Sequence, residues 1–167
     1  MDMTDNSILN NDQILHKTRR IAYQILENNI NEQEVVIAGI SGNGYVFATR
    51  IQKILSEISD LKITLCEVYI NKSQPREKIT TSISKELYEN KSLVLVDDVL
   101  NSGATLIYGV KHFLEVSLLK FKTAVLVNRN HKNFPVKADF KGISLSTSIK
   151  EHIKVEFTEN SAKAYLN

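Results

Sequence analysis

The chain has one cysteine, two prolines and no tryptophan among its 167 residues. Because the single Cys66 cannot form a disulfide within the chain, we expect a protein of the reducing cytoplasm. No apolar run approaches the roughly 20 residues that a membrane-spanning helix needs. The polar start, residues 1–7, also lacks the apolar stretch of a secretory signal. We therefore expect neither a membrane segment nor a leader.

The chain also lacks a large excess of one charge. It has 21 Lys and Arg residues and 19 Asp and Glu residues, which gives a net charge of +2. So small an excess argues against a general nucleic-acid-binding protein but leaves room for a local basic patch. Hydrophobic residues make up 43% of the chain, which is enough for a core at this length. We expect one domain over residues 1–167.

The most informative segment of the chain covers residues 93–105. Its first four residues are apolar and suit a buried parallel strand, and Asp97 and Asp98 follow them. Next comes a small, hydroxylated loop that leads into a helix-compatible stretch, residues 106–115. The residues of this loop are Asn101, Ser102, Gly103, Ala104 and Thr105. Backbone amides, two hydroxyls and the positive end of a helix would converge there on an anion, and we expect a phosphate.

Asp97 and Asp98 suit a different part of the ligand from the phosphate. A pair of carboxylates accepts hydrogen bonds from a vicinal diol and repels a bare phosphate, so we expect a sugar beside Asp97 and Asp98. Adjacent acids after a strand also hold Mg²⁺ in receiver and phosphatase folds, and such a loop can be only a capped helix start. A receiver would carry its acids after the first strand, and a phosphatase would show Asp-x-Asp. Neither arrangement occurs in this sequence.

A second glycine-containing turn follows the strand predicted at residues 35–38. Its residues are Ser41, Gly42, Asn43 and Gly44. Two glycines within three residues allow backbone amides to approach an anion closely. Alone, such a turn is often only a turn, but together with the first loop it fits a substrate that carries phosphate at both ends.

Apolar periodicity predicts strands that alternate with helices. Asn10 with Gln13 forms a predicted capping box before a first helix that ends near residue 28. The remaining predicted elements are helices over 45–58 and 106–115 and strands over 35–38, 63–70, 93–98 and 121–128, with a polar loop over 71–78. The residues predicted to face inward are Ile14, Thr18, Ile21, Ala22 and Ile25 in the first helix and Val46, Ile51, Ile54 and Leu55 in the second.

This alternation indicates an α/β fold with a mainly parallel sheet and right-handed crossovers. Ligands of such sheets bind at the carboxyl ends of the strands, near a topological switch point. If the strands that begin at Val35 and Leu93 are neighbours, the two loops meet across one crevice.

The segment 93–105 resembles the 5-phosphoribosyl-1-pyrophosphate (PRPP) signature of the type I phosphoribosyltransferases. That signature reads four apolar residues, two acids, an apolar residue, a spacer of two residues, Thr or Ser, Gly, any residue and Thr, and this chain fills every position. The resemblance implies a Rossmann-like, mainly parallel sheet flanked by helices, with a small hood. It also implies that Asp97 and Asp98 bind the ribose hydroxyls, that residues 101–105 wrap the 5′-phosphate, and that residues 41–44 bind pyrophosphate.

The activity implied by the resemblance is transfer of the phosphoribosyl group from PRPP to a nucleobase, with release of pyrophosphate. The implied cofactor is Mg²⁺, bound mainly through oxygens of PRPP, with no metal ligand expected directly from the protein.

The resemblance is closest to the PyrR branch of the family, which comprises pyrimidine-operon regulators that are also uracil phosphoribosyltransferases, and it runs from Ile8 to Ile149. Further points of match are Arg20, Ile21, Ala22, Glu67, Val96 to Leu100, Ala124 to Val127, Arg129, His131, Pro135, Asp139 and Gly142. This branch implies uracil as the base and a homodimer or larger homo-oligomer. It places Val127, Asn128 and Arg129 on the nucleobase side and forms the hood from about residue 136 onward plus N-terminal parts.

The chain departs from that branch at the phosphate loops. Gly42-Asn43-Gly44 replaces Thr-Arg-Gly, and Ala104 replaces a Lys or Arg, so two cations near the phosphates are absent. Asn128 replaces an Asp. We expect Arg76 or Lys78, on the polar loop, to close over the site instead.

Asn101 bears on the choice of base. It stands where purine-specific relatives often carry an Asp that exchanges a proton with the base. Because an amide cannot act as a general base, Asn101 favours uracil, whose ring N–H is fairly acidic.

Two other functions fit the same motif. One is an RNA-binding transcriptional attenuator of the PyrR kind that uses the PRPP site to sense nucleotides, and the other is a PRPP or nucleotide sensor with little or no turnover. The cations that would form an RNA-binding face are Lys17, Arg19, Arg20, Lys132, Lys137, Lys150 and Lys154.

Overall fold

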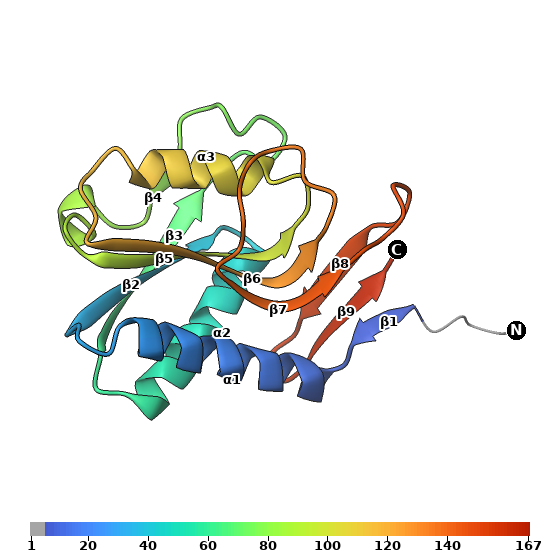
Figure 1. Cartoon of the computed structure of the whole chain (residues 1–167), viewed down its shortest axis with the longest axis horizontal. Coiled ribbons are helices and arrows are strands. Elements are labelled where there is room, and N and C mark those ends of the chain that lie inside the picture. Colours follow the sequence, from blue (N-terminus) through green and yellow to red (C-terminus); the bar gives the residue numbers. More distant parts are fainter. Residues whose placement is uncertain (1–5) are drawn as a thin grey trace, which may run out of the picture.

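The computed structural model describes residues 6–167 (Figure 1). Most of the polar start, on which the expectation of no secretory signal rests, lies outside the described residues. The helices are α1 (Asn11–Asn28), α2 (Asn43–Ile58), the short 3₁₀ helix η1 (Lys85–Leu87) and α3 (Ala104–Phe113). The strands are β1 (Ser7–Leu9), β2 (Glu34–Ile40), β3 (Lys62–Tyr69), β4 (Thr80–Thr81), β5 (Ser92–Leu100), β6 (Lys120–Arg129), β7 (Phe140–Leu145), β8 (Ile153–Phe157) and β9 (Ala162–Leu166).

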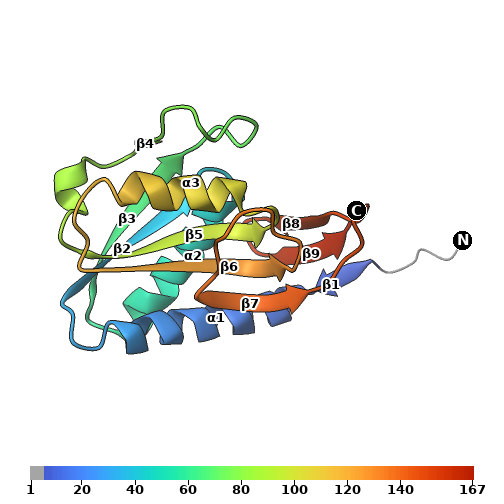
Figure 2. The same ribbon diagram turned by 45° about the horizontal axis from the view of Figure 1, so that its top comes forward.

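The described strands form a large sheet in the order β4-β3-β2-β5-β6-β7 and a small sheet in the order β1-β9-β8. In the large sheet β4 pairs antiparallel with β3, and the other neighbours pair parallel. The small sheet is antiparallel and lies beyond the carboxyl ends of β5 and β6 (Figure 2). This confirms the predicted mainly parallel sheet flanked by helices.

The helices cover both faces of the large sheet. Helices α1 and α2 lie together on one face, and α3 lies on the other (Figures 1 and 2). On the first face, α1 and α2 share a core cluster with strands of both sheets. On the second face, Leu106 and Phe113 of α3 pack with apolar side chains of β2, β3 and β5. The small sheet is thereby fixed to the same core that holds α2.

Local sequence explains how the first helix begins and which face it buries. Asn10 caps α1, with its side chain accepting from the Gln13 backbone N–H at 2.9 Å and the Gln13 side chain accepting from the Asn10 N–H at 2.9 Å. The buried side chains of α1 are the predicted Ile14, Thr18, Ile21, Ala22 and Ile25. The predicted capping box and apolar face are both confirmed.

Helices α2 and α3 begin earlier than predicted, at Asn43 and Ala104 rather than at residues 45 and 106. The residue before each helix is a glycine with positive φ. Because these helices begin without a capping side chain at that glycine, the sequence carries no capping motif that would mark the start. In α2, Ile51, Ile54 and Leu55 are buried as predicted. The inward placement of Val46 was wrong, since its side chain is 36% exposed.

Strands β2 and β5 are neighbours, which meets the condition for the two loops to face one crevice, and they lie at the switch point of the large sheet. Their pairing runs from Val36 opposite Leu93 to Gly39 opposite Val96 and then ends. Strand β5 continues along β6 as far as Leu100 opposite Asn128, so it is longer than the predicted 93–98. Asp97 and Asp98 therefore come directly after Val96, the last residue of β5 that pairs with β2. At this point β5 still pairs with β6.

The segment after residue 136 divides between the two sheets. Strand β7 pairs with β6 in the large sheet, whereas β8 and β9 form the small sheet with β1. The small sheet therefore begins later than the predicted boundary near residue 136, because β7 continues the parallel pairing of the large sheet. Strand β1, at the N-terminal end of the described residues, pairs with β9 in the small sheet. Within residues 6–167, no helix has the length and apolar character of a membrane span.

Candidate active site

Two helix N-termini point toward the crevice between β2 and β5. Gly42 precedes α2 with a φ of 91°, and Gly103 precedes α3 with a φ of 89°. The N-cap residue of each helix is a glycine without a capping side chain, so most first-turn amides and both positive helix ends remain available to an anion. A β-carbon on Gly103 would also come within 2.7 Å of Val136 Cγ1. Glycine is thus required at the start of α3 for two reasons.

The start of α2 lies directly against the end of β5. A β-carbon on Gly44 would stand 2.8 Å from Asp97 Oδ1 and 3.1 Å from the Val96 carbonyl oxygen. Asp97 is consequently enclosed, with an exposed fraction of 4%. Its Oδ1 accepts a hydrogen bond from the Asp98 backbone N–H at 2.9 Å.

Burial has an electrostatic consequence for Asp97. Desolvation, followed by the neighbouring charge of Asp98, raises the pKa of the Asp97 carboxyl from its ordinary 3.8 to about 8. The ammonium group of Lys72, 3.8 Å from Asp97 Oδ1, acts in the opposite direction. A buried carboxyl beside a second carboxylate can accept hydrogen bonds from hydroxyl groups or attract a cation.

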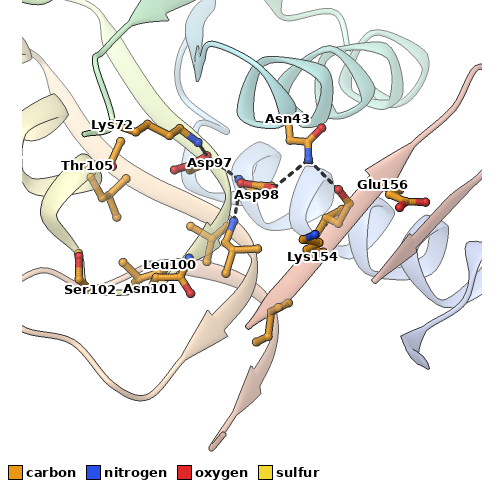
Figure 3. Close-up of a pocket in the computed structure, with 16 residues that line it drawn as sticks. Asn43, Lys72, Asp97, Asp98, Leu100, Asn101, Ser102, Thr105, Lys154 and Glu156 are labelled. Atoms are coloured by element: carbon orange, nitrogen blue, oxygen red, sulfur yellow. Dashed lines mark hydrogen bonds and ion pairs between the residues drawn. The ribbon is translucent and has the colours of Figure 1, made fainter. Parts of the chain in front are cut away.

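Asp98 is held by two hydrogen bonds. Its Oδ1 accepts from the Val99 backbone N–H at 2.9 Å, and its Oδ2 accepts from Asn43 Nδ2 at 3.2 Å. The same amide group of Asn43 donates to the Val155 carbonyl oxygen at 2.7 Å (Figure 3). Asn43 therefore links the start of α2 to an acid on β5 and to β8 of the small sheet.

These groups surround a cavity of about 360 Å³. Its lining includes Asn43, both acids and four residues of the loop 101–105, namely Asn101, Ser102, Gly103 and Thr105. Residues 153–156 of β8 close it from the small sheet (Figure 3). The predicted sugar-binding acids and the predicted 5′-phosphate loop thus line one cavity at the switch point.

The loop of residues 101–105 is braced from outside the site. The Ser102 carbonyl oxygen accepts from the backbone N–H groups of Asn133 and Phe134, at 2.8 and 3.1 Å. The Ser102 hydroxyl accepts from the Ala104 N–H at 3.2 Å. Ala104 does not line the cavity, so a longer side chain there is not needed to complete its wall.

Only one of the four residues predicted to bind pyrophosphate lines the cavity, namely Asn43. The Ser41 hydroxyl donates to Glu67 Oε1 at 3.0 Å, and the Ser41 N–H donates to the Val68 carbonyl oxygen at 2.8 Å. Ser41 is therefore tied to β3, Gly42 begins α2, and Gly44 lies under Asp97.

The three residues predicted on the nucleobase side lie at the carboxyl end of β6. Val127 is fully buried in the core. The Arg129 guanidinium donates to the Thr147 hydroxyl at 2.5 Å and to the Ser148 carbonyl oxygen at 2.7 Å, which holds the segment after β7. Asn128 donates to the Ser144 hydroxyl at 3.2 Å, and its buried Oδ1 has no hydrogen-bond partner in the described chain. None of the three lines the cavity.

Two cations line the cavity that sequence reasoning did not assign to it, Lys72 and Lys154 (Figure 3). Lys72 belongs to the polar loop after β3, and Lys154 to β8. Arg76 and Lys78, which we expected to close over the site, line a different cavity against α3. The sequence gives no local signal that separates Lys72 from these neighbours.

Several residues of the predicted RNA-binding face have partners within the chain, among them Arg19 with the Tyr23 hydroxyl and Lys137 with Asp139. Arg20 donates to the backbone carbonyl oxygens of Lys141 and Gly142, at 2.6 and 2.8 Å, and so joins α1 to β7.

The site's carboxylates suit a hard cation that shares its ligands with a substrate. Among the described residues there is no group of three or more His, Cys, Asp and Glu side chains that could hold a metal ion. Mg²⁺ prefers oxygen ligands and commonly takes one or two carboxylates together with phosphate oxygens and water. Asp97 and Asp98 fit such a shared arrangement.

Comparison with known proteins gives a consistent picture. Residues 5–160 match the phosphoribosyl transferase domain family. The chain is 32% identical over 151 residues to the Bifunctional protein PyrR of Streptococcus thermophilus (strain CNRZ 1066), with 89% of this chain and 87% of the relative covered. It is 32% identical over 165 residues to the Bifunctional protein PyrR of Macrococcus caseolyticus, with 93% and 94% covered.

Solved structures share the fold at lower identity. The hypoxanthine phosphoribosyltransferase of Trypanosoma cruzi aligns with a TM-score of 0.80 at 13% identity, covering 99% of this chain and 98% of that one. A hypoxanthine-guanine phosphoribosyltransferase from Bacillus anthracis aligns with a TM-score of 0.71 at 18% identity, covering 88% and 84%. This likeness extends to both sheets of the molecule.

Proposed function

This chain belongs to the phosphoribosyltransferase family, and we propose that it is a cytoplasmic enzyme that transfers the phosphoribosyl group of PRPP to uracil and releases pyrophosphate. The observation that carries the proposal is the position of Asp97 and Asp98 in one cavity between the N-termini of α2 and α3. That cavity offers carboxylate acceptors in its middle and backbone donors on two sides.

The acids are proposed to hold the ribose. Two adjacent carboxylates can accept from the 2′ and 3′ hydroxyls, and the strand that carries them is fixed by β6 and by Gly44. Holding the ribose in one orientation lowers the barrier to attack at its anomeric carbon, because the reacting atoms need no further ordering. Asp97 and Asp98 are thus proposed as positioning groups in contact with the substrate.

The two ends of PRPP are proposed to bind on opposite sides of the acids. The amides and hydroxyls of residues 101–105 suit the 5′-phosphate, with the α3 N-terminus behind them. Asn43, Lys72 and Lys154 suit the pyrophosphate, on which negative charge grows as the bond to the ribose breaks. Lys72 and Lys154 would supply the positive charge that Asn43 does not.

Mg²⁺ is the proposed cofactor, bound mainly through oxygens of PRPP, while Asp97 and Asp98 accept from the ribose hydroxyls. When bound, it would neutralise charge on the leaving pyrophosphate.

Uracil is proposed as the base on the strength of Asn101 and of the PyrR relatives. Asn101 lines the cavity with an amide, which cannot take a proton from a purine. A pyrimidine whose ring N–H is already fairly acidic needs less assistance of this kind.

The proposal is tested by incubating the protein with PRPP, Mg²⁺ and one base at a time, and measuring pyrophosphate release. The bases are uracil, hypoxanthine, guanine, adenine, xanthine and orotate. We expect release with uracil and its loss in Asp97→Asn and Asp98→Asn, which keep the shape of the side chains. Release with a purine and none with uracil would refute the assignment of the base.

A second candidate is a sensor that binds PRPP or a nucleotide with little turnover, either alone or as an RNA-binding attenuator. The observation that favours it is Asn43, an uncharged amide held between Asp98 and Val155 at the pyrophosphate side. Measurable PRPP binding without turnover of any base would support the sensor. An attenuator would also bind pyrimidine-operon leader RNA with an affinity that falls steeply as salt is added.

A further inference from the structure

A second cavity lies between the polar loop after β3 and the outer side of α3. Its volume is about 350 Å³, and it shares no lining residue with the cavity that holds Asp97 and Asp98. Residues 75–79 form one wall, and residues of α3 together with Glu115 after it form the other. A space of this size is within the range of about 300–1,000 Å³ found for small-molecule sites.

Positive charge from both walls gathers around this cavity. Arg76 and Lys78 come from the loop, and Lys111 comes from α3. Within residues 6–167 the ion pairs involve other side chains, so these three cations face the cavity without a carboxylate partner. The Lys111 ammonium instead lies 6.0 Å from the centre of the Tyr108 ring, which also lines the cavity.

Two carboxylates share the lining, Glu77 and Glu115. The Glu77 carboxylate accepts a hydrogen bond from Asn71 Nδ2 at 3.0 Å, and this bond ties the carboxylate to another residue of the same loop. The three cations therefore exceed the carboxylates around the cavity, and an anion is favoured there over a cation.

His112 supplies an independent observation. Its Nε2 atom is buried and has no hydrogen-bond partner in the described chain, and the residue lines the same cavity. Burial lowers the pKa of this imidazole, so the neutral ring presents Nε2 as either a donor or an acceptor. Buried polar atoms without a partner are rare in folded proteins, and because this one has almost no surface open to water, only a shift of the ring toward the cavity would bring it to a ligand atom.

We propose that this cavity binds a small molecule that carries phosphate groups, with Arg76, Lys78 and Lys111 around the phosphates and His112 in the cavity wall. Phosphate offers several charged oxygens to cations that come from different directions, which matches two walls that each supply positive charge. Because the loop that carries Arg76 also carries Lys72, the ligand would fix Lys72 beside Asp97.

The test follows amide signals of the full chain by nuclear magnetic resonance during titration with inorganic pyrophosphate. Signals of residues 76–79 and 111–115 report this cavity, and those of residues 101–105 report the active site. We expect saturable shifts in the first group. In the double variant Arg76→Gln/Lys111→Gln, the dissociation constant from that group should rise at least about tenfold while the response of residues 101–105 is retained.

Lys85→Gln is the control, since it removes an exposed cation on η1 and should change neither group. No saturable shift in residues 76–79 and 111–115, or the same response in the double variant and the wild type, would overturn the proposal. Neither result involves catalysis, so failure here is distinguishable from failure of the proposed activity.

A parallel titration with uridine 5′-diphosphate identifies the source of the phosphates. Equal affinities assign the cavity to free pyrophosphate. Tighter binding of the nucleotide than of pyrophosphate assigns the cavity to a nucleotide whose base contacts the Tyr108 ring. In that case Tyr108→Leu should reduce the affinity for the nucleotide to that for pyrophosphate. Both outcomes support a phosphate site.

Discussion

Gly44 and Asp97 approach each other so closely that a β-carbon on Gly44 would stand 2.8 Å from Asp97 Oδ1. Gly44→Ala should therefore displace the Asp97 side chain and raise the dissociation constant of PRPP at least about tenfold, the effect of losing one charge-assisted hydrogen bond. Calorimetric titration with PRPP and Mg²⁺ measures this change.

Gly109→Ala is the matched control for Gly44→Ala. Its β-carbon would meet Leu95 Cδ2 at 2.9 Å, so it too crowds a helix against β5, but away from the cavity. It should leave PRPP affinity unchanged. Equal affinities in Gly44→Ala and the wild type would show that the position of Asp97 does not depend on this contact.

The buried Asp97 should make stability depend on pH. Its pKa is about 8 in the folded protein against an ordinary 3.8, so between these values the folded state keeps a proton that the unfolded chain has lost. The resulting stability is fully present below about pH 3.8 and is lost as the pH rises through 8, with a slope of up to about 1.4 kcal/mol per pH unit. Denaturant unfolding of the wild type and of Asp97→Asn, measured without ligands across this range, isolates the contribution.

Asp97→Asn should gain stability relative to the wild type as the pH increases, because the amide has no proton to lose. Parallel pH profiles for the two proteins would contradict the burial of a protonated Asp97.

Asn43 stands where the family resemblance places an arginine, and its amide bonds both Asp98 and Val155. Asn43→Arg should increase kcat for pyrophosphate release by about tenfold, because a cation would face the leaving group where an amide now does. Steady-state kinetics with PRPP and uracil measure the change, with Asn43→Gln as the uncharged control. An unchanged kcat in Asn43→Arg would mean that the amide does not limit turnover.

Lys72→Gln should lower kcat/KM for PRPP by about tenfold, since its ammonium lies 3.8 Å from Asp97 Oδ1 and lines the same cavity. The side chain is 50% exposed, which limits the effect through solvent screening. Lys85→Gln, a removal of charge away from both cavities, serves as the comparison. Equal losses in the two variants would indicate a general charge effect rather than a contact with the substrate.

Much of the fold could be predicted because its signals are local. The capping box at Asn10 and the apolar spacing from Ile14 to Ile25 determine α1 without help from distant residues. The starts of α2 and α3 were placed too late because Gly42 and Gly103 begin these helices through backbone conformation rather than a capping side chain. Strands β4 and β1 are too short to show a periodic pattern.

The site could be predicted only where it is local as well. Residues 97–105 form a continuous segment, and the pairing of β2 with β5 brings Asn43 to them. Lys72 and Lys154 come from a loop and from the small sheet, and their approach depends on long-range packing that residue type and spacing do not encode. The resemblance places Arg129 on the nucleobase side, yet its guanidinium donates to residues 147 and 148.

The most direct test of the account is the affinity for PRPP in the presence of Mg²⁺, measured by calorimetry on the wild type and on Asp97→Asn/Asp98→Asn. We expect one molecule of PRPP at the site of Asp97 and Asp98 in each chain, displaced by uridine 5′-monophosphate. In the double variant the dissociation constant should rise by at least about a hundredfold, since two charge-assisted contacts to the ribose are lost. Unchanged affinity in the variant would contradict the central claim that Asp97 and Asp98 hold the ribose of PRPP.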